Sequence, residues 1–420
     1  MKRRFMMKSY ISPCLKGGAL LAACILIGLL LVMGAYATPA DAVRGNLRSS
    51  VDMLIEEGMY PLSIPGYTPS KLDNFTDAIM LGNAIVAPEE TLLSDALLAH
   101  RLDSNYPAEA LRDYLAGETD AKTVSYSNYW HGYIVMLKPL LCVLSYSSIR
   151  ILLMAVQIAL VVLTAVLLEK RKLGRYAIAL AAMYISLCPV AVMSSLTYSS
   201  MYLVGMGASA LMLAGHERLK KIGYGYVFLV LGAITSYVDF LTYPVFTLGV
   251  PMTVYVLLER EEEKNILARA FMLCVLWGIG YGVMWASKWV LVALLTDVNG
   301  LHEALAQILL RTDQRLDNVG EVAFWAGLES GLEMILNPLN ALMLAGCAAA
   351  CVCMVFRRGV AKEKTVPVMT LLLTAMLPVA WMIFACNHTV SHSFYAYRNL
   401  AVLIFAGLCA LLMLGKEKKV

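Results

Sequence analysis

Charged side chains are scarce in this 420-residue chain, where Asp, Glu, Lys and Arg make up 15% of the residues and apolar residues make up 60%. Soluble domains carry about 25% charged and about 45–50% apolar residues. The shortage of charge excludes a soluble enzyme, a disordered hub and a nucleic-acid-binding protein, so no nucleic-acid partner is expected. The apolar runs are also too long for the ~10-residue alternating strands of an outer-membrane barrel. With a mean hydropathy of +0.68, the sequence predicts an all-α polytopic membrane protein with a single membrane domain over residues 1–420.

Sequence motifs for nucleotides and metal clusters are missing as well. The chain has no Walker loop and no GxGxxG after a strand, so it carries no signal for nucleotide binding. Most of its 10 cysteines lie in apolar runs, where cysteine behaves as a small hydrophobic residue. Cys351 and Cys353 are too close to form a CxxC pair, and no histidine accompanies them. The cysteines therefore predict neither a disulfide framework nor a zinc site.

Apolar stretches long enough to cross a membrane are frequent, since a spanning helix needs about 20 apolar residues. We predict about ten transmembrane helices. They cover residues 18–36, 150–168, 176–194, 199–215, 223–238, 243–258, 267–295, 334–355, 366–386 and 395–414. The stretch 129–146 is also apolar, but it contains Lys138 and Pro139. We therefore expect it to form a helix on the outer membrane surface rather than a span.

Basic residues follow an alternating pattern along these spans. Most of the 34 Lys and Arg residues lie in six segments, at residues 2–16, 169–175, 216–222, 259–269, 356–365 and 416–420. The positive-inside rule places all six segments in the cytoplasm. We therefore expect a protein of the cytoplasmic (plasma) membrane with both termini inside. The first 37 residues end in the signal-like Ala35-Tyr36-Ala37, but their apolar core exceeds the usual 7–15 residues, so a retained first helix is expected.

This topology leaves two long extracytoplasmic loops, at residues 37–149 and 297–333. The first loop contains helix-like stretches at residues 41–58, 89–100 and 107–116, separated by prolines. Polar chemistry is expected on this outer face, mainly in the first loop.

Two aspartates of the first loop are the strongest candidates for chemistry. Asp73 and Asp77, in LDNFTDAIML, are four residues apart and share a face of a helix. Such a pair can supply a general base or hold a divalent cation, Mg²⁺ or Mn²⁺, which is the one cofactor left open. The structural alternative is that Asp73 or Asn74 caps a helix at 75–85 and Asp77 stabilises its first turn.

Ionisable residues within the predicted spans lie near the outer helix ends. An ion-coupled transporter would need such residues at the midplane. Candidates to bind the phosphate of a lipid whose tail stays in the bilayer are Arg150, Asp239, Lys288, His388, His392, Arg398 and His131. Structural alternatives also apply: His131 in an aromatic belt, and Lys288 reaching toward the membrane surface. Arg311 and Arg315 are expected on one face of a helix at 301–316, as a solvated surface or a second ligand contact.

The layout resembles that of the GT-C superfamily of polyprenyl-phosphate-dependent membrane glycosyltransferases, such as the protein mannosyltransferases and the aminoarabinose transferase. The matching stretches are LDNFTDAIML, YWHGYIVMLKPLLCVLSYSSIRIL and EKRKLGRYAIALAAMYISLCP, within residues 15–300. The acid pair lies later in the chain than is usual in the family, and the separate carbohydrate-binding domain of many members is missing.

The resemblance implies transfer of a sugar from a polyprenyl-phosphate donor to an extracytoplasmic acceptor, which is a cell-envelope glycan, a lipid or a protein. It implies inversion at the anomeric carbon, with Asp77 or Asp73 as the general base. Arg398, Lys288, Arg150 and His388 would surround the phosphate. Three alternatives stay open: an O-antigen-type polymerase or ligase, a lipid or polysaccharide exporter, and a non-catalytic membrane subunit of an envelope complex.

Overall fold

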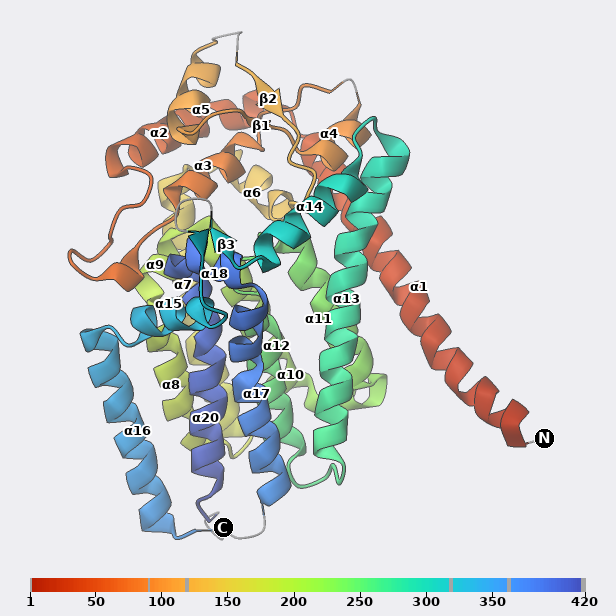
Figure 1. Cartoon of the computed structure of the whole chain (residues 1–420), viewed down its shortest axis with the longest axis vertical. Coiled ribbons are helices and arrows are strands. Elements are labelled where there is room, and N and C mark those ends of the chain that lie inside the picture. The colour runs from red at the N-terminus through yellow and green to blue at the C-terminus, as the bar shows by residue number, and fades with distance from the viewer. Residues whose placement is uncertain (1, 90, 118–120, 317–319, 361–363, 417–420) are drawn as a thin grey trace.

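A bundle of long helices carries a cap of short elements at one end (Figure 1). The computed structural model describes residues 2–89, 91–117, 121–316, 320–360 and 364–416, with the backbone alone for residues 2–12. Within these residues the strands form two short antiparallel sheets of two strands each. They pair β1 (Arg101–Leu102) with β2 (Thr123–Val124), and β3 (Arg315–Leu316) with β4 (Gly320–Glu321).

Seven helices among the described residues are long and apolar enough to cross a membrane. They are α1 (Lys2–Tyr36), α7 (Tyr146–Lys170), α10 (Leu196–Ile222), α13 (Ile266–Leu295), α16 (Pro338–Arg358), α17 (Thr365–Phe384) and the segment Ser393–Met413. That last segment comprises α19 (Ser393–Ala396), η3 (Tyr397–Leu400) and α20 (Ala401–Met413). Two apolar helices, α11 (Tyr224–Val238) and α12 (Val245–Glu259), are shorter. The prediction of an all-α membrane protein is confirmed, whereas the number of ten spans stays a prediction.

The predicted span at 176–194 is not one helix, which corrects the sequence-based expectation. After the short turn η2 (Gly174–Tyr176), the chain forms α8 (Ala177–Ser186), breaks, and resumes as α9 (Pro189–Ser194). Within a continuous helix Pro189 would remove a backbone hydrogen bond and clash with the preceding turn. The chain instead leaves the helix before it, and Cys188 lies in the left-handed region at φ 54°. Pro189 is then the first residue of the new helix, where its missing N–H is no loss.

The cap consists mainly of the first long loop. Its helices are α2 (Asp41–Glu57), α3 (Asn74–Gly82), α4 (Leu92–Leu98), α5 (Pro107–Ala116) and α6 (Ile134–Leu141), with the turn η1 (Thr68–Ser70). Helices therefore form within all three predicted stretches. The apolar stretch 129–146 yields only the eight-residue α6 before α7 begins, and α6 is too short to cross a membrane. Its position on the outer membrane surface stays a prediction.

The second long loop and the turn before the last helix complete the cap. They contribute α14 (Gly300–Thr312), the hairpin β3–β4, α15 (Ala326–Ile335) and α18 (Cys386–Ser391).

Segments with many basic residues gather at the end opposite the cap. There Lys364 pairs with Glu261 at 2.6 Å, Lys220 pairs with Glu259 at 3.1 Å, and Arg175 donates to the Gly415 carbonyl at 3.2 Å. The predicted basic segments at 356–365 and 416–420 lie partly outside the described residues, and that at 2–16 is described by its backbone alone as far as residue 12. The basic segments thus lie at one end of the bundle, as their alternation along the predicted spans requires. Which end of the bundle faces the cytoplasm stays a prediction.

Glycines allow α11 and α13 to pack in close contact. A Cβ atom on Gly232 would lie 2.0 Å from the carbonyl oxygen of Trp277, and one on Gly280 would lie 2.0 Å from that of Leu229. Small residues of this kind let membrane helices approach backbone to backbone. The contact lies about two turns before Asp239, which follows the last residue of α11.

Gly280→Ala is expected to destabilise the protein, because its methyl group has no space against the Leu229 backbone. Overpacking costs about 1–3 kcal/mol, and we expect a lower midpoint of thermal unfolding in detergent. Gly278→Ala, two residues away on the same helix, is the matched control, because nothing lies within 4 Å of its added Cβ. Equal midpoints for the two variants would contradict this account of the packing.

Candidate functional site

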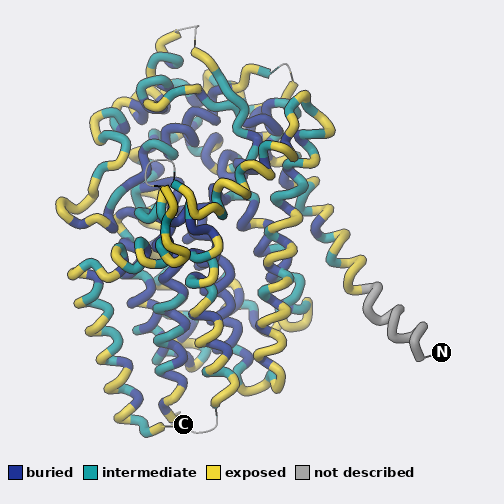
Figure 2. The backbone as a smooth tube through the Cα atoms, in the orientation of Figure 1, coloured by how far each residue is buried: buried dark blue, intermediate teal, exposed yellow. Residues whose placement is uncertain are grey.

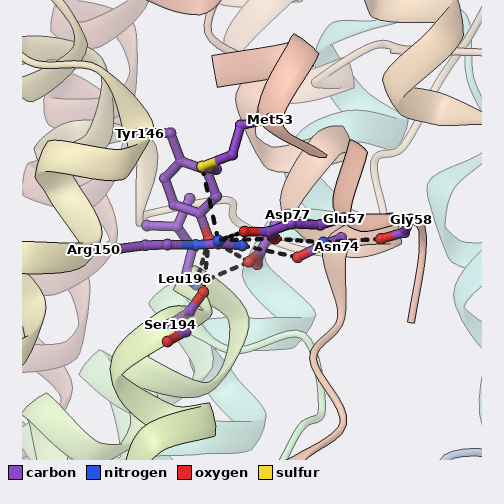
Figure 3. A network of polar contacts seen from close by, with 9 residues as sticks. All are labelled: Met53, Glu57, Gly58, Asn74, Asp77, Tyr146, Arg150, Ser194 and Leu196. Carbon is purple, nitrogen blue, oxygen red and sulfur yellow. Dashed lines mark hydrogen bonds and ion pairs between the residues drawn. The ribbon is translucent and has the colours of Figure 1, made fainter. Parts of the chain in front are cut away.

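Asp77 lies in a closed network of hydrogen-bond donors. Its Oδ1 accepts from the Ser195 hydroxyl at 3.1 Å and from the N–H and hydroxyl of Thr197 at 3.1 and 2.8 Å. Its Oδ2 accepts from the Leu196 N–H at 3.3 Å and from the Tyr146 hydroxyl (Figure 3). The side chain is fully buried.

This network caps a helix from a distant segment. Helix α10 begins at Leu196, and Asp77 accepts from its first N–H groups, where a negative charge also suits the helix dipole. Burial raises the pKa of the Asp77 carboxyl, while the hydrogen bonds from Tyr146 and Thr197 act to lower it. The prediction that Asp77 mainly stabilises the first turn of its own helix misses this role.

A divalent cation does not fit the Asp73–Asp77 pair. The oxygens of Asp77 face five hydrogen-bond donors, whose hydrogens occupy the directions that a cation would need. Within the described ranges, no group of three His, Cys, Asp or Glu side chains is placed to hold a metal ion. We therefore assign no role to a metal at this pair.

Arg150 is neutralised within a neighbouring network. Its Nη1 donates to both carboxylate oxygens of Glu57 at 2.7 and 2.9 Å, and its Nη2 donates to the Asn74 side-chain oxygen at 2.9 Å (Figure 3). The guanidinium lies 4.6 Å from the Tyr146 ring centroid. Asn74 in turn donates to Glu57 and to the Gly58 carbonyl, both at 2.9 Å. The network ties α2, α3 and α7 together.

Asp73 caps α3, which confirms the structural alternative for this residue. Its Oδ1 accepts from the Thr76 N–H at 3.0 Å, and Thr76 supplies all the hydrogen bonds that described residues make to it. Burial raises the pKa of the Asp73 carboxyl to about 7, and the nearby Asp77 charge adds to this shift. The carboxyl of Asp73 can therefore accept further hydrogen bonds, whereas both oxygens of Asp77 are already taken up by donors. The pKa of Asp73 also lies near neutral pH.

Four tyrosines lie in the electrostatic field of Arg311, and each is also acted on by one of two aspartates. Asp73 and Arg311 both act electrostatically on Tyr126 and Tyr395. Asp239 and Arg311 both act on Tyr129 and Tyr281. We call this cluster the tyrosine site. It consists of Asp73, Tyr126, Tyr129, Asp239, Tyr281, Arg311, His388, His392 and Tyr395.

Arg311 is the cation of the tyrosine site. One of its terminal N–H groups donates to Nδ1 of His388 at 2.7 Å, and Nε2–H of His388 donates to the Leu241 carbonyl at 2.6 Å. The Nε of Arg311 is buried and has no hydrogen-bond partner among the described residues. Arg315 lies apart: α14 ends at Thr312, so the expectation that Arg311 and Arg315 share a helix face is wrong.

Both predicted histidines of the last loop are neutral. Burial lowers the pKa of His388 well below its ordinary value, and the Arg311 charge adds to the shift. Burial and Arg311 together lower the pKa of His392 to about 4. His392 stacks on Tyr395, with ring centroids 5.1 Å apart.

Asp239 holds the turn that follows α11. Its Oδ1 accepts from the N–H and the hydroxyl of Thr242, both at 2.9 Å, and its Oδ2 accepts from the Tyr281 hydroxyl at 3.3 Å. Burial raises the pKa of its carboxyl to about 6, against the effect of these hydrogen bonds. Asp239 thus belongs to the tyrosine site through its hydrogen bond with Tyr281.

Each of the three guanidinium nitrogens of Arg398 already donates to a backbone carbonyl. The acceptors are the carbonyls of Leu187 at 2.9 Å, Phe394 at 2.9 Å and Pro69 at 3.2 Å. The guanidinium is fully buried and lies 4.1 Å from the Tyr198 ring centroid. Arg398 therefore joins η1, the break after α8 and the last helix, instead of lining the site as predicted.

Lys288 and His131 also contact backbone carbonyls of the cap. Lys288 Nζ donates to the Ala96 carbonyl at 2.9 Å and lies 5.4 Å from the Trp130 ring centroid. His131 Nε2 lies 2.7 Å from the Tyr126 carbonyl oxygen, and burial, with the Lys288 charge, lowers its pKa to about 3. Its ring packs against the Tyr126 ring at 5.0 Å, which fits the aromatic alternative.

The four tyrosines carry no sequence signal that marks them as site residues. They come from three segments that are distant in the chain, at residues 126–129, in α13 and in α19, and only the tertiary structure brings them near Arg311. Arg311 carries a weak sequence signal that it faces the protein, because it lies about two turns after Glu303 on a short amphipathic helix.

Comparison with known proteins gives no relative for this fold or site. No family model matches the chain, and neither a curated protein nor a solved structure is significantly similar to it.

Asp77→Asn is expected to lower the free energy of unfolding by about 1–3 kcal/mol, because an amide N–H would face the donors that the carboxylate now accepts from. The measurement is thermal unfolding in detergent. Asp41→Asn is the control, since the Asp41 side chain is 93% exposed. An Asp77→Asn variant as stable as Asp41→Asn would contradict the capping role.

Proposed function

We propose that this protein is a membrane glycosyltransferase of the cytoplasmic membrane. It moves a sugar from a polyprenyl-phosphate donor to an extracytoplasmic glycan, lipid or protein acceptor, with inversion of the anomeric carbon. The observation that carries the proposal is that a carboxyl and a guanidinium act electrostatically on the same two tyrosines, Tyr126 and Tyr395. The carboxyl is that of the buried Asp73, whose pKa is raised to about 7, and the guanidinium is that of the half-buried Arg311, whose buried Nε has no partner among the described residues.

The residues divide into two chemical roles. Asp73 takes the proton from the acceptor hydroxyl, and the resulting oxygen attacks the anomeric carbon. The bond from that carbon to the phosphate oxygen breaks, and polyprenyl phosphate leaves with the electron pair. Arg311 stabilises the charge that develops on the phosphate. Inversion requires the base and the phosphate on opposite faces of the sugar.

This assignment selects among the residues predicted from sequence. Asp73 is preferred to Asp77 as the base, because Asp77 has its oxygens filled by donors to α10. Arg311 is preferred to Arg398 and Lys288 as the phosphate ligand, because those cations already bind backbone carbonyls. His388 positions Arg311 through its Nδ1.

Asp73→Asn is expected to abolish transfer, with a loss of about 10²–10⁴-fold, because the amide cannot accept the hydroxyl proton. The assay is transfer from polyprenyl-phosphate sugars by the purified protein. Thermal unfolding checks that the variant folds, and Asp41→Asn again serves as the surface control.

Full transfer by a folded Asp73→Asn variant would overturn the assignment of the base. No transfer by the wild-type protein from a panel of polyprenyl-phosphate sugars would favour the exporter and the non-catalytic subunit over the proposal.

Transfer is expected to depend on pH through Asp73. Its pKa is raised to about 7, and a base acts only in its deprotonated form. Activity is therefore present above pH 7 and falls tenfold per pH unit as the pH drops through this value. The measurement is kcat/KM between about pH 5 and about pH 9. The active Asp73→Glu variant should move the inflection, and a profile unaffected by this change would contradict the role.

A further inference from the structure

Helix α14 carries the tyrosine-site cation on its inner face. Arg311 on this face donates to His388, and Glu303, two turns earlier, accepts from the Ser127 hydroxyl at 3.2 Å. Ala304 lies buried between them. This face therefore lies on the cap and reaches the site through its last turn.

The outer face of α14 is apolar and uncovered. Leu301, Leu305 and Leu309 follow one another at four-residue spacing, and they are 51, 58 and 61% exposed. Figure 2 shows exposed residues along this helix, which Figure 1 places across the front of the cap. A helix that is polar toward the protein and apolar toward its surroundings lacks the pattern of a water-facing helix.

This apolar face follows the exposed apolar end of α13 along the chain. Helix α13 is apolar enough to cross a membrane, and its last turn exposes Leu294 and Leu295, a few residues before Leu301. The turn between the helices is tight, since a Cβ on Gly300 would lie 3.0 Å from the Trp289 carbonyl oxygen. The exposed apolar surface at the end of α13 is thus followed, after a short turn that exposes Asp297 and Asn299, by the exposed apolar face of α14.

Exposed aromatic residues lie just after the β3–β4 hairpin on the same loop. Phe324 and Trp325 are both exposed ahead of α15. Tryptophan gathers at membrane–water boundaries, because its ring has an apolar body and a polar N–H. Their exposure fits a loop that meets the lipid surface.

We propose that α14 is an interfacial lid, whose leucine face inserts into the lipid leaflet next to the cap and thereby holds Arg311 in the tyrosine site. The occupant of this face is the boundary between lipid head groups and acyl chains, where amphipathic helices lie. The contact with lipid is independent of the proposed function. Its effect on transfer rests on that function.

Photo-crosslinking tests the lipid contact. Benzoylphenylalanine replaces Leu305 in the full-length protein, reconstituted in vesicles of phosphatidylethanolamine and phosphatidylglycerol. After irradiation, mass spectrometry should find phospholipid adducts on the α14 peptide. The same probe at Tyr106, which is 58% exposed at the start of α5 in the cap, is the control and should give few adducts. An adduct to a second copy of the chain, or no excess of lipid adducts over the control, would overturn the proposal.

Hydrogen–deuterium exchange in the same vesicles tests the coupling to Arg311. The Leu305→Glu and Leu309→Glu double variant should exchange about tenfold faster than wild type in α14 and α18, because the lid is released from the lipid. Tyr106→Glu is the control and should exchange like the wild type. Unchanged exchange in both helices of the double variant would overturn the lid. If the double variant does not fold, the crosslinking result still decides the lipid contact.

The two proposals fail in different ways. Lipid adducts on α14 without any transfer activity in the wild-type protein would leave the lid standing and reject the glycosyltransferase. Transfer activity without lipid adducts on α14 would reject the lid and leave the glycosyltransferase standing.

Discussion

The carboxylate of Asp77 at the start of α10 is the contact on which the cap depends. It is buried, and its charge is balanced by the first N–H groups of α10 and by hydroxyl groups from two apolar helices. A buried carboxylate without such donors would be costly. Asp77 thereby joins α3 of the first loop to the first turns of α7 and α10. That arrangement also places Asp73, one helical turn earlier, beside the tyrosines.

The cations of the cap fall into two groups according to the partners that they bind. Arg398 and Lys288 donate to backbone carbonyls, and Arg150 pairs with Glu57, so these three join chain segments. Arg311 differs, because its nearest partner is a neutral histidine and its Nε has none among the described residues. A cation in this state retains the capacity to meet an anion. The proposed chemistry and the proposed lid both follow from this difference.

The apolar stretches and their short helices were predictable, and the partners of the polar residues were not. The helices at 41–58 and 107–116 formed nearly as expected, because local propensity and proline boundaries determine them. The span at 176–194 failed because hydropathy averages over a break that one proline causes. Capping of α3 by Asp73 or Asn74 could be foreseen as an alternative, because a helix cap is a local feature of the sequence. The partners of Asp77 could not, since its donors on and before α10 lie 118–120 residues away.

The sequence by itself determined the class of protein, since only a bilayer accommodates so many apolar runs, and the pattern of basic segments at one end of the bundle. The tertiary structure decided which charged residues remain able to meet a ligand. That choice depends on hydrogen bonds between segments that are distant in the chain. Composition cannot report such bonds, because each donor and acceptor looks the same in sequence whether it is satisfied or free.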